Sequence, residues 1–158
     1  MKFNQTIMKL ILVLIAAFAL SACSTAKKSG STSGDVYTGK DTIKYLASGV
    51  ADRVFFATNR TNLTTAARDT LRKQADYLRK NKKLKVVVEG HADERGTREY
   101  NLALGEKRAN AARDYLMTYG ISGKRISVIS YGKEKPVNSA SSRLAWSQNR
   151  RSVTVKVK

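Results

Sequence analysis

The sequence is poor in cysteine, in acidic residues and in long apolar runs. Its 158 residues contain one cysteine and 12 Asp+Glu against 30 Lys+Arg. A single cysteine excludes an internal disulfide. The apolar run at residues 10–20 is shorter than the roughly 20 residues that a membrane-spanning helix needs. Because this run follows two lysines and precedes the small pair Ser21-Ala22, it is typical of an export signal, which we predict over residues 1–22.

The lone cysteine, Cys23, comes directly after the expected cleavage site. The order Leu-Ser-Ala-Cys resembles the bacterial lipoprotein signal, in which the cysteine becomes the acylated first residue of the mature chain. Each buried CH₂ of an acyl chain such as palmitate contributes about 0.8 kcal/mol to membrane binding. We therefore expect a lipid anchor at Cys23, and Ser24 in place of Asp after it favours the outer membrane. The alternative is an ordinary export signal beside an unmodified thiol.

The scarcity of acidic residues gives a formal net charge of +18, and removal of Lys2 and Lys9 with the signal would take it from +18 to +16. Such a charge favours polyanions, among which nucleic acid is the usual partner. Export argues against nucleic acid, because the acidic partners outside the cytoplasm are cell-wall glycopeptide and anionic lipid. We therefore predict no nucleic-acid partner, and non-specific polyanion binding remains an alternative function.

The mature chain divides into a polar segment and one domain. Residues 24–40 are rich in Ser, Thr, Gly and Lys, which predicts a flexible tether. We assign residues 23–49 to the lipidated cysteine and its tether, and residues 50–158 to the domain.

The domain alternates between strand and helix patterns. Apolar residues recur with the period of a strand or of a helix in six segments, which are residues 53–57, 84–89, 125–131 and 153–157 for strands and 64–80 and 99–119 for helices. One-sided strands imply a sheet that has helices on one face only. The sequence therefore predicts an α/β (α+β) two-layer sandwich around a mixed four-stranded sheet.

Two polar residues fall on the apolar stripe of the second predicted helix. Asn101 and Arg108 lie seven residues apart, hence roughly 10 Å along the helix axis. An unpaired buried guanidinium costs several kcal/mol, so Arg108 needs an anion. Asp93, in the loop before the helix, is the nearest candidate. Asp93 and Arg108 either form a structural pair or together bind a ligand that carries both charges.

Other uses of this loop are weaker. His91 and Asp93 are two possible metal ligands without a third nearby. The adjacent carboxylates Asp93 and Glu94 do not face each other across a bond, as glycosidase catalysis requires. No nucleophile stands with a base. We predict no metal, no cofactor and no enzymatic activity.

The motifs of this region resemble the OmpA-like C-terminal domain family over about residues 50–157. They are GHADERGT at residues 90–97, Tyr100-Asn101 with Leu104 and Arg108, VISYGKEKP at residues 128–136, and Asn149-Arg150-Arg151. The resemblance implies an OmpA-like fold and non-covalent binding of peptidoglycan through the diaminopimelate of its stem peptides.

The resemblance also implies a role for each site residue. Asp93 would hold the ammonium of diaminopimelate and Arg108 its carboxylate, while Asn59 and Asn101 would complete the pocket. A site with both charges at fixed separation selects such a zwitterion over plain anions. The implied partners are peptidoglycan, TolB and other Tol proteins, and outer-membrane lipid through Cys23.

The chain departs from the family pattern at two positions. Ala57 stands where the family often has Asp, and Arg98 stands where it often has Pro. Arg150 and Arg151 resemble a terminal pair of which one usually packs inward, so we expect them to support the fold or form a basic rim.

Overall fold

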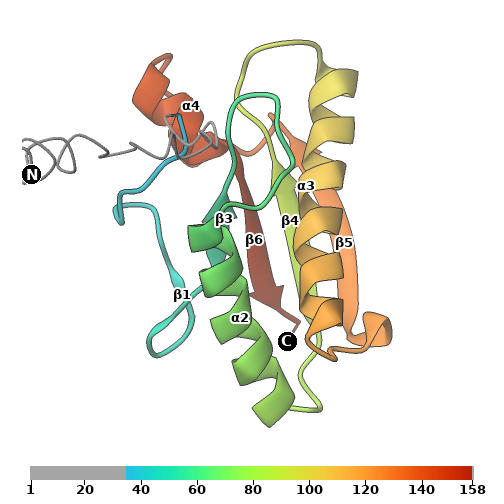
Figure 1. Cartoon of the computed structure of the whole chain (residues 1–158). Coiled ribbons are helices and arrows are strands. Elements are labelled where there is room, and N and C mark those ends of the chain that lie inside the picture. The colour runs from blue at the N-terminus through green and yellow to red at the C-terminus, as the bar shows by residue number, and fades with distance from the viewer. Residues whose placement is uncertain (1–34, 158) are drawn as a thin grey trace, which may run out of the picture. The chain divides into compact units, whose positions relative to one another are not determined.

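The computed structural model of the chain describes residues 35–157, which belong to one compact unit. A four-stranded sheet runs through it in the order β3 (Arg53–Phe55), β6 (Arg151–Lys156), β4 (Val86–His91) and β5 (Ile126–Gly132). The β4–β5 pair is parallel, whereas β6 is antiparallel to both of its neighbours. Figure 1 shows the four strands side by side. The predicted mixed four-stranded sheet is confirmed.

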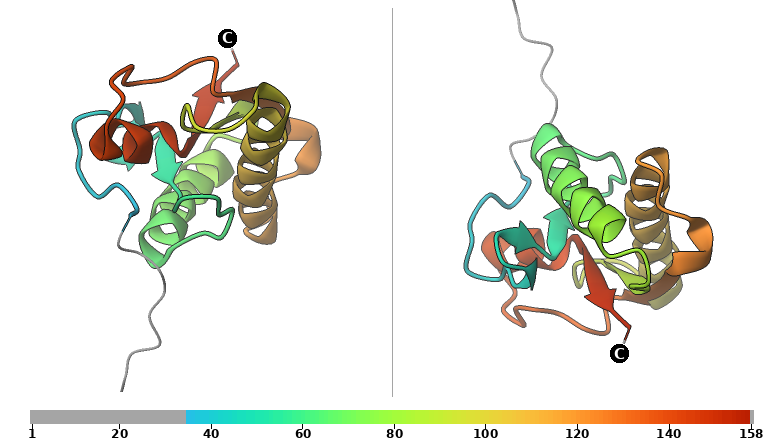
Figure 2. Two further views of the ribbon diagram at one scale, coloured as in Figure 1. Left: turned by 90° about the horizontal axis from the view of Figure 1, so that it is seen from above. Right: turned by 90° about the horizontal axis from the view of Figure 1, so that it is seen from below.

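Two helices, α2 (Thr65–Lys80) and α3 (Arg98–Thr118), pack on one face of this sheet and against each other. Figure 2 shows them together when the molecule is viewed from above and from below. Each helix begins after a threonine whose hydroxyl accepts a backbone N–H of the first turn, Thr64 for α2 and Thr97 for α3. These N-caps satisfy donors that have no partner within the helix. The predicted two-layer arrangement is therefore confirmed.

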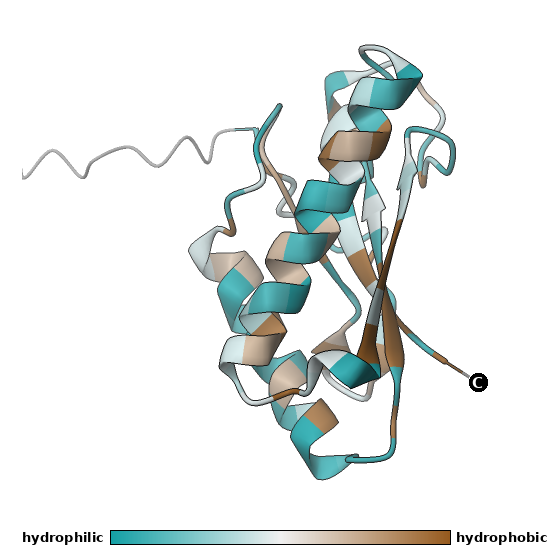
Figure 3. Ribbon diagram, turned by 90° about the vertical axis from the view of Figure 1, so that its right-hand side faces the viewer, coloured by the Kyte–Doolittle hydropathy of each residue, from teal (hydrophilic) through white to brown (hydrophobic). Residues whose placement is uncertain are grey.

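The hydrophobic core lies between the sheet and these helices. Strand alternation sends Val86 and Val88 of β4 toward the helices, where both are buried. Phe56, Leu71 and Leu116 complete the centre of the cluster. Figure 3 shows strongly hydrophobic segments on the strands, whereas the helices carry many hydrophilic residues. Burial of these side chains provides the main stabilisation of the domain.

The backbones of α3 and β4 approach each other at two glycines. A Cβ atom built on Gly90 would lie 1.8 Å from the carbonyl oxygen of Gly105, and one built on Gly105 would lie 2.4 Å from Ser130 Oγ. Only glycine fits at such a contact. The contact fixes the height of α3 over the sheet, and with it the position of the loop that joins the two elements.

Residues 35–49, which we expected in the flexible tether, pack against the domain instead. Tyr37 is buried and meets the ring of Phe55 edge-on, with the ring centroids 4.8 Å apart. Leu46 is buried in β1 (Tyr45–Ala47), which pairs with β2 (Val50–Ala51). The domain boundary predicted at residue 50 is therefore too late. The expected export signal, Cys23 and the first part of the tether lie outside the described residues.

Two short helices complete the described chain, η1 (Gly123–Arg125) and α4 (Arg143–Asn149). α4 lies directly before the last strand, β6. Among residues 35–157, no helix is both long enough and apolar enough to cross a membrane.

Candidate functional site

The candidate site lies in the loop between β4 and α3. This loop turns sharply at Gly96, whose φ of 91° is in the region that favours glycine. The side-chain amide of Asn101 donates to the carbonyl of Arg95 at 2.8 Å and closes the loop over the first turn of α3. Asn101 is 1% exposed, as its place on the apolar stripe predicted.

A pocket of about 330 Å³ opens beside this loop. Three of the four predicted ligand residues, Asn59, Asp93 and Asn101, line it together with Arg95 and Tyr100. Asn59 comes from the segment after β3, and its side-chain oxygen accepts the hydroxyl of Tyr100. The fold therefore brings together side chains that are 42 residues apart in the sequence.

Asp93 is a nearly buried carboxylate between two arginines. Arg95 donates to it from Nε at 3.0 Å, from Nη2 at 2.8 Å and from its backbone N–H at 3.1 Å. Arg150 Nη1 lies 3.4 Å away on the other side. Burial would raise the pKa of Asp93, but the hydrogen bonds of Arg95 and the charges of Arg95 and Arg150 hold it below its ordinary value. Asp93 is therefore ionised at neutral pH.

The fourth predicted residue, Arg108, lies outside the lining of this pocket. Its side chain is 0% exposed, and its guanidinium donates to three carbonyl oxygens, those of Arg60 at 3.0 Å, His91 at 2.9 Å and Ala57 at 3.1 Å. Burial and the charge of Arg150 lower its pKa to about 10, so it remains a cation at pH 7. Within residues 35–157 Arg108 forms no ion pair with Asp93. The two are not the structural pair that the sequence left open.

Two residues of the site were missed by the sequence analysis. Arg95 lies 4.3 Å above the ring of Trp146, and the indole Nε1 of Trp146 donates to Glu94 at 2.7 Å. The one available signal was the position of Arg95 between Glu94 and Gly96 in the quoted motif. A loop carries no periodicity, so nothing in the sequence showed that Arg95 turns back onto Asp93.

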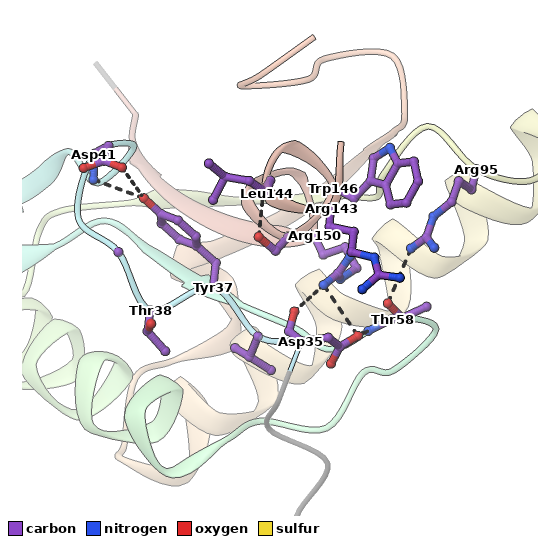
Figure 4. Close-up of a pocket in the computed structure, with 13 residues that line it drawn as sticks. Asp35, Tyr37, Thr38, Asp41, Thr58, Arg95, Arg143, Leu144, Trp146 and Arg150 are labelled. Atoms are coloured by element: carbon purple, nitrogen blue, oxygen red, sulfur yellow. Dashed lines mark hydrogen bonds and ion pairs between the residues drawn. The ribbon is translucent and has the colours of Figure 1, made fainter. Parts of the chain in front are cut away.

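A second, larger cavity of about 680 Å³ adjoins the first and shares Thr58 and Arg95 with it. Its other walls are the segment at residues 35–41 and helix α4 (Figure 4). Arg150, at the end of α4, is buried and donates from Nε to the carbonyl of Phe56 at 3.0 Å. Thr58 and Arg95 thus belong to the walls of both cavities, Arg150 lines the larger one and Asp93 lines the smaller one.

The remaining predictions for single residues divide as follows. Arg151 is buried and donates to the carbonyls of Asn149 and Lys135, which is the inward packing that the terminal pair indicated. Arg98 is exposed and pairs with Glu134 at 3.2 Å. At the position of Ala57, the backbone carbonyl accepts Arg108.

Residues 35–157 contain no group of three or more His, Cys, Asp or Glu side chains that could hold a metal ion. Asp93 and Glu94 make their contacts with different partners, Arg95 and Trp146 respectively.

Comparison with known proteins gives consistent matches. The chain matches the OmpA family over residues 55–150. It is 42% identical over 151 residues to the peptidoglycan-associated lipoprotein of Agrobacterium fabrum. This alignment covers 92% of the present chain and 85% of the Agrobacterium protein. It is 43% identical over 158 residues to the protein of the same name from Rhizobium meliloti. This alignment covers 96% of the present chain and 90% of the Rhizobium protein.

Solved structures agree with these matches. The crystal structure of the peptidoglycan-associated lipoprotein from Burkholderia pseudomallei matches this chain with a TM-score of 0.66 and 37% sequence identity. The match covers 67% of the present chain and 90% of the Burkholderia chain. The C-terminal domain of Helicobacter pylori MotB shares the fold at 20% identity, with a TM-score of 0.63 over 68% of this chain and 84% of its own.

Proposed function

The chain belongs to the OmpA family, and from that membership and the geometry of the site we propose that it binds peptidoglycan non-covalently, through the diaminopimelate of the stem peptides. The observation that carries the proposal is the ionised, nearly buried Asp93 at the wall of a pocket, with cations on both sides. The names of its relatives support the same ligand.

In this proposal Asp93 accepts the ligand ammonium, which replaces part of the bonding that Arg95 now provides. Asn59 and Asn101 contribute polar contacts from the pocket wall. Arg108 holds the ligand carboxylate. Three of its five N–H groups donate to carbonyls, which leaves two for a ligand. Because Arg108 is buried, the carboxylate reaches it only when the turn that carries the Ala57 and Arg60 carbonyls moves aside, which also frees the two N–H groups that donate to those carbonyls.

Each charge-assisted hydrogen bond contributes about 1.5–3 kcal/mol, so a single site binds with modest affinity. We propose that acylated Cys23 anchors the domain to the periplasmic side of the outer membrane, beside a polymer that repeats the ligand many times. The high local concentration of stem peptides around the anchored domain then keeps its ligand site occupied despite the modest affinity. The chain thereby links outer membrane and cell wall by a reversible contact and performs no catalysis.

The test is sedimentation with purified sacculi. We expect wild-type chain to pellet with diaminopimelate-containing sacculi, and to pellet much less with sacculi whose stem peptides carry lysine, which lacks the second carboxylate. Asp93→Asn should pellet much less than wild type with the diaminopimelate-containing sacculi, because it removes the acceptor of the ammonium. The variants are compared at a temperature where thermal melts show each to be folded.

A matched variant separates this site from the alternative of non-specific polyanion binding. Asp114→Asn changes the net charge by the same amount as Asp93→Asn, but Asp114 is exposed on α3 and pairs with its neighbour Arg113. Non-specific binding predicts that both variants pellet at least as well as wild type, since both become more basic. Loss in Asp93→Asn alone supports the site. Release of soluble muropeptides in the same tubes would instead indicate an enzyme.

We further propose that the chain acts within the Tol-Pal system, with TolB and other Tol proteins as partners in envelope integrity and cell division. This assignment rests on the family resemblance of the sequence motifs. Failure of immobilised chain to retain TolB would remove it, and competition between TolB and sacculi would locate TolB at the same face.

A further inference from the structure

Asp35 lies in the segment assigned to the tether, yet it contacts the candidate site directly. Its carboxylate Oδ2 accepts the backbone N–H of Thr58 at 2.7 Å and lies 3.5 Å from Arg150 Nη2. The same Nη2 also donates to the backbone carbonyl of Asp35. Figure 4 shows Asp35 between Thr58 and Arg150. The segment is therefore fastened at the rim of the ligand pocket by its own carboxylate.

Asp35 and Asp93 share one cation. Arg150 reaches Asp93 with Nη1 at 3.4 Å and Asp35 with Nη2 at 3.5 Å. A second connection runs through Thr58, whose hydroxyl accepts Arg95 at 3.4 Å, while Arg95 itself pairs with Asp93. These five residues form a closed ring of hydrogen bonds and ion pairs that joins the amino-terminal segment to the pocket.

The charges of this ring affect how strongly Asp93 can attract the ammonium of a ligand. Arg150 is buried, and the charged groups beside its guanidinium are the carboxylates of Asp35 and Asp93. With Asp35 present, two carboxylates face the two arginines of the ring. Without Asp35, both arginines would act on Asp93 alone, and the surroundings of a ligand ammonium would carry one more positive charge.

We propose that Asp35 is a positioning residue of the ligand site: by taking part of the charge of Arg150, it leaves Asp93 able to accept the ammonium of diaminopimelate. The inference rests on the proposed function, because it names a further residue of the same site. It also means that the site is complete only with the amino-terminal segment in place. The depressed pKa of Asp35, which hydrogen bonds from Thr58 and the charge of Arg150 produce against the effect of burial, agrees with a carboxylate held in this ring.

The experiment compares two synthetic stem peptides, one with diaminopimelate and one with a hydrogen in place of its side-group ammonium. Binding is followed by the fluorescence of Trp146, the only tryptophan, which Arg95 covers. We expect Asp35→Asn to weaken binding of the first peptide about threefold to tenfold, a modest effect since the Asp35 side chain is 43% exposed. Binding of the second peptide should change less than about twofold, because it brings no ammonium to Asp93.

Two further variants serve as controls. Asp35→Glu keeps the charge and should restore most of the affinity. Asp41→Asn removes a carboxylate of the same segment that accepts only the hydroxyl of Tyr37 and should leave both affinities unchanged. Equal weakening of both peptides in Asp35→Asn would indicate a general loss of structure and would overturn the inference.

A measurement without ligand separates this inference from the proposed function. The carboxyl carbon of Asp93 is titrated by NMR in wild type and in Asp35→Asn. We expect a lower pKa of Asp93 in the variant, because Arg150 then acts on Asp93 alone. An unchanged pKa of Asp93, with normal binding of the diaminopimelate peptide by Asp35→Asn, overturns the role of Asp35 and leaves the proposed function intact. Failure of the wild-type chain to bind the peptide overturns both.

Discussion

Arg108 joins three segments of the backbone through its guanidinium. Its partners are the carbonyls of Ala57 and Arg60 after β3 and of His91 at the end of β4, while Arg108 itself is on α3. Ala57 and Arg60 lie beyond the end of β3, and His91 is the last residue of β4. One buried side chain therefore supplies hydrogen bonds that regular secondary structure cannot provide there.

We expect Arg108→Ala to lower the free energy of unfolding by about 3 kcal/mol or more, because three carbonyls lose a donor at about 1 kcal/mol or more each. Urea denaturation measures the change. Arg113→Ala is the matched control on the same helix, since Arg113 pairs only with the exposed Asp114 and should cost less than about 0.5 kcal/mol. Similar losses in both variants would contradict the bracing role of Arg108.

The spacing of the sequence was sufficient to place Asn101 and Arg108 in the interior, because both follow the period of a long helix. It was insufficient to identify their partners. An anion was expected for Arg108, whereas backbone carbonyls satisfy it. Asp93, likewise, pairs with Arg95 two residues away and with Arg150 near the other end of the domain. Such contacts depend on loop conformation, which hydrophobic periodicity does not encode.

At the scale of secondary-structure elements, one close contact near the site is that of α3 with β4 at Gly90 and Gly105. It lies just before the loop that carries Asp93. Any side chain at Gly90 would push the start of α3 away from the sheet, and with it the pocket wall formed by Asn101. Helix packing and ligand geometry are therefore coupled.

We expect Gly90→Ala to destabilise the domain by about 3 kcal/mol, because its Cβ would overlap backbone that cannot give way. Thermal unfolding followed by circular dichroism measures this loss. Gly123→Ala in η1 is the comparison, since its Cβ would come no closer than 3.4 Å to the flexible end of Met117. If Gly90→Ala unfolds at the wild-type temperature, the contact is not as tight as described.

The elements differ in how well the sequence predicted them. The four strands of the main sheet and the two long helices were predicted because each repeats its apolar residues with a clear period. Residues 35–49 were assigned to the tether because their average composition is polar. Tyr37 and Leu46, which dock this segment, are isolated apolar residues and form no pattern. Docking of this kind is decided by the surface that receives the segment.

The stability of the domain should depend on pH through one histidine. His91, the only histidine in the chain, is 1% exposed. Burial lowers its pKa from 6.5 to about 3, and the charges of Arg151, Arg53 and Lys135 act in the same direction. Below pH 6.5 the unfolded chain binds a proton on His91 that the folded chain does not accept. Stability is therefore lost as the pH falls from 6.5 toward 3.

Between pH 7 and pH 5 we expect the free energy of unfolding to fall by roughly 2 kcal/mol, at about 1.4 kcal/mol per pH unit once His91 of the unfolded chain is protonated. Urea titrations at both pH values measure the difference. His91→Phe keeps an aromatic ring beside Tyr131 and should remove most of the pH dependence. If the free energy of unfolding of His91→Phe falls between pH 7 and pH 5 as much as that of wild type, other groups titrate in this range.

The fold as a single body was predicted well, because a two-layer arrangement follows from one-sided strands and amphipathic helices. The relation between the site and the amino-terminal segment was not predicted, since it needs Asp35, Arg150 and Asp93 to meet in space. Those residues span almost the full length of the described chain.

Arg150 also determines how the domain would carry mechanical load. If the chain before Asp35 leads to a lipid anchor, as we propose, tension from the membrane enters the domain at Asp35, and tension from the wall enters at Asp93. The two carboxylates lie on opposite sides of one guanidinium. Part of the traction between the two layers of the envelope then passes through the ion pairs of Arg150, without first crossing the sheet.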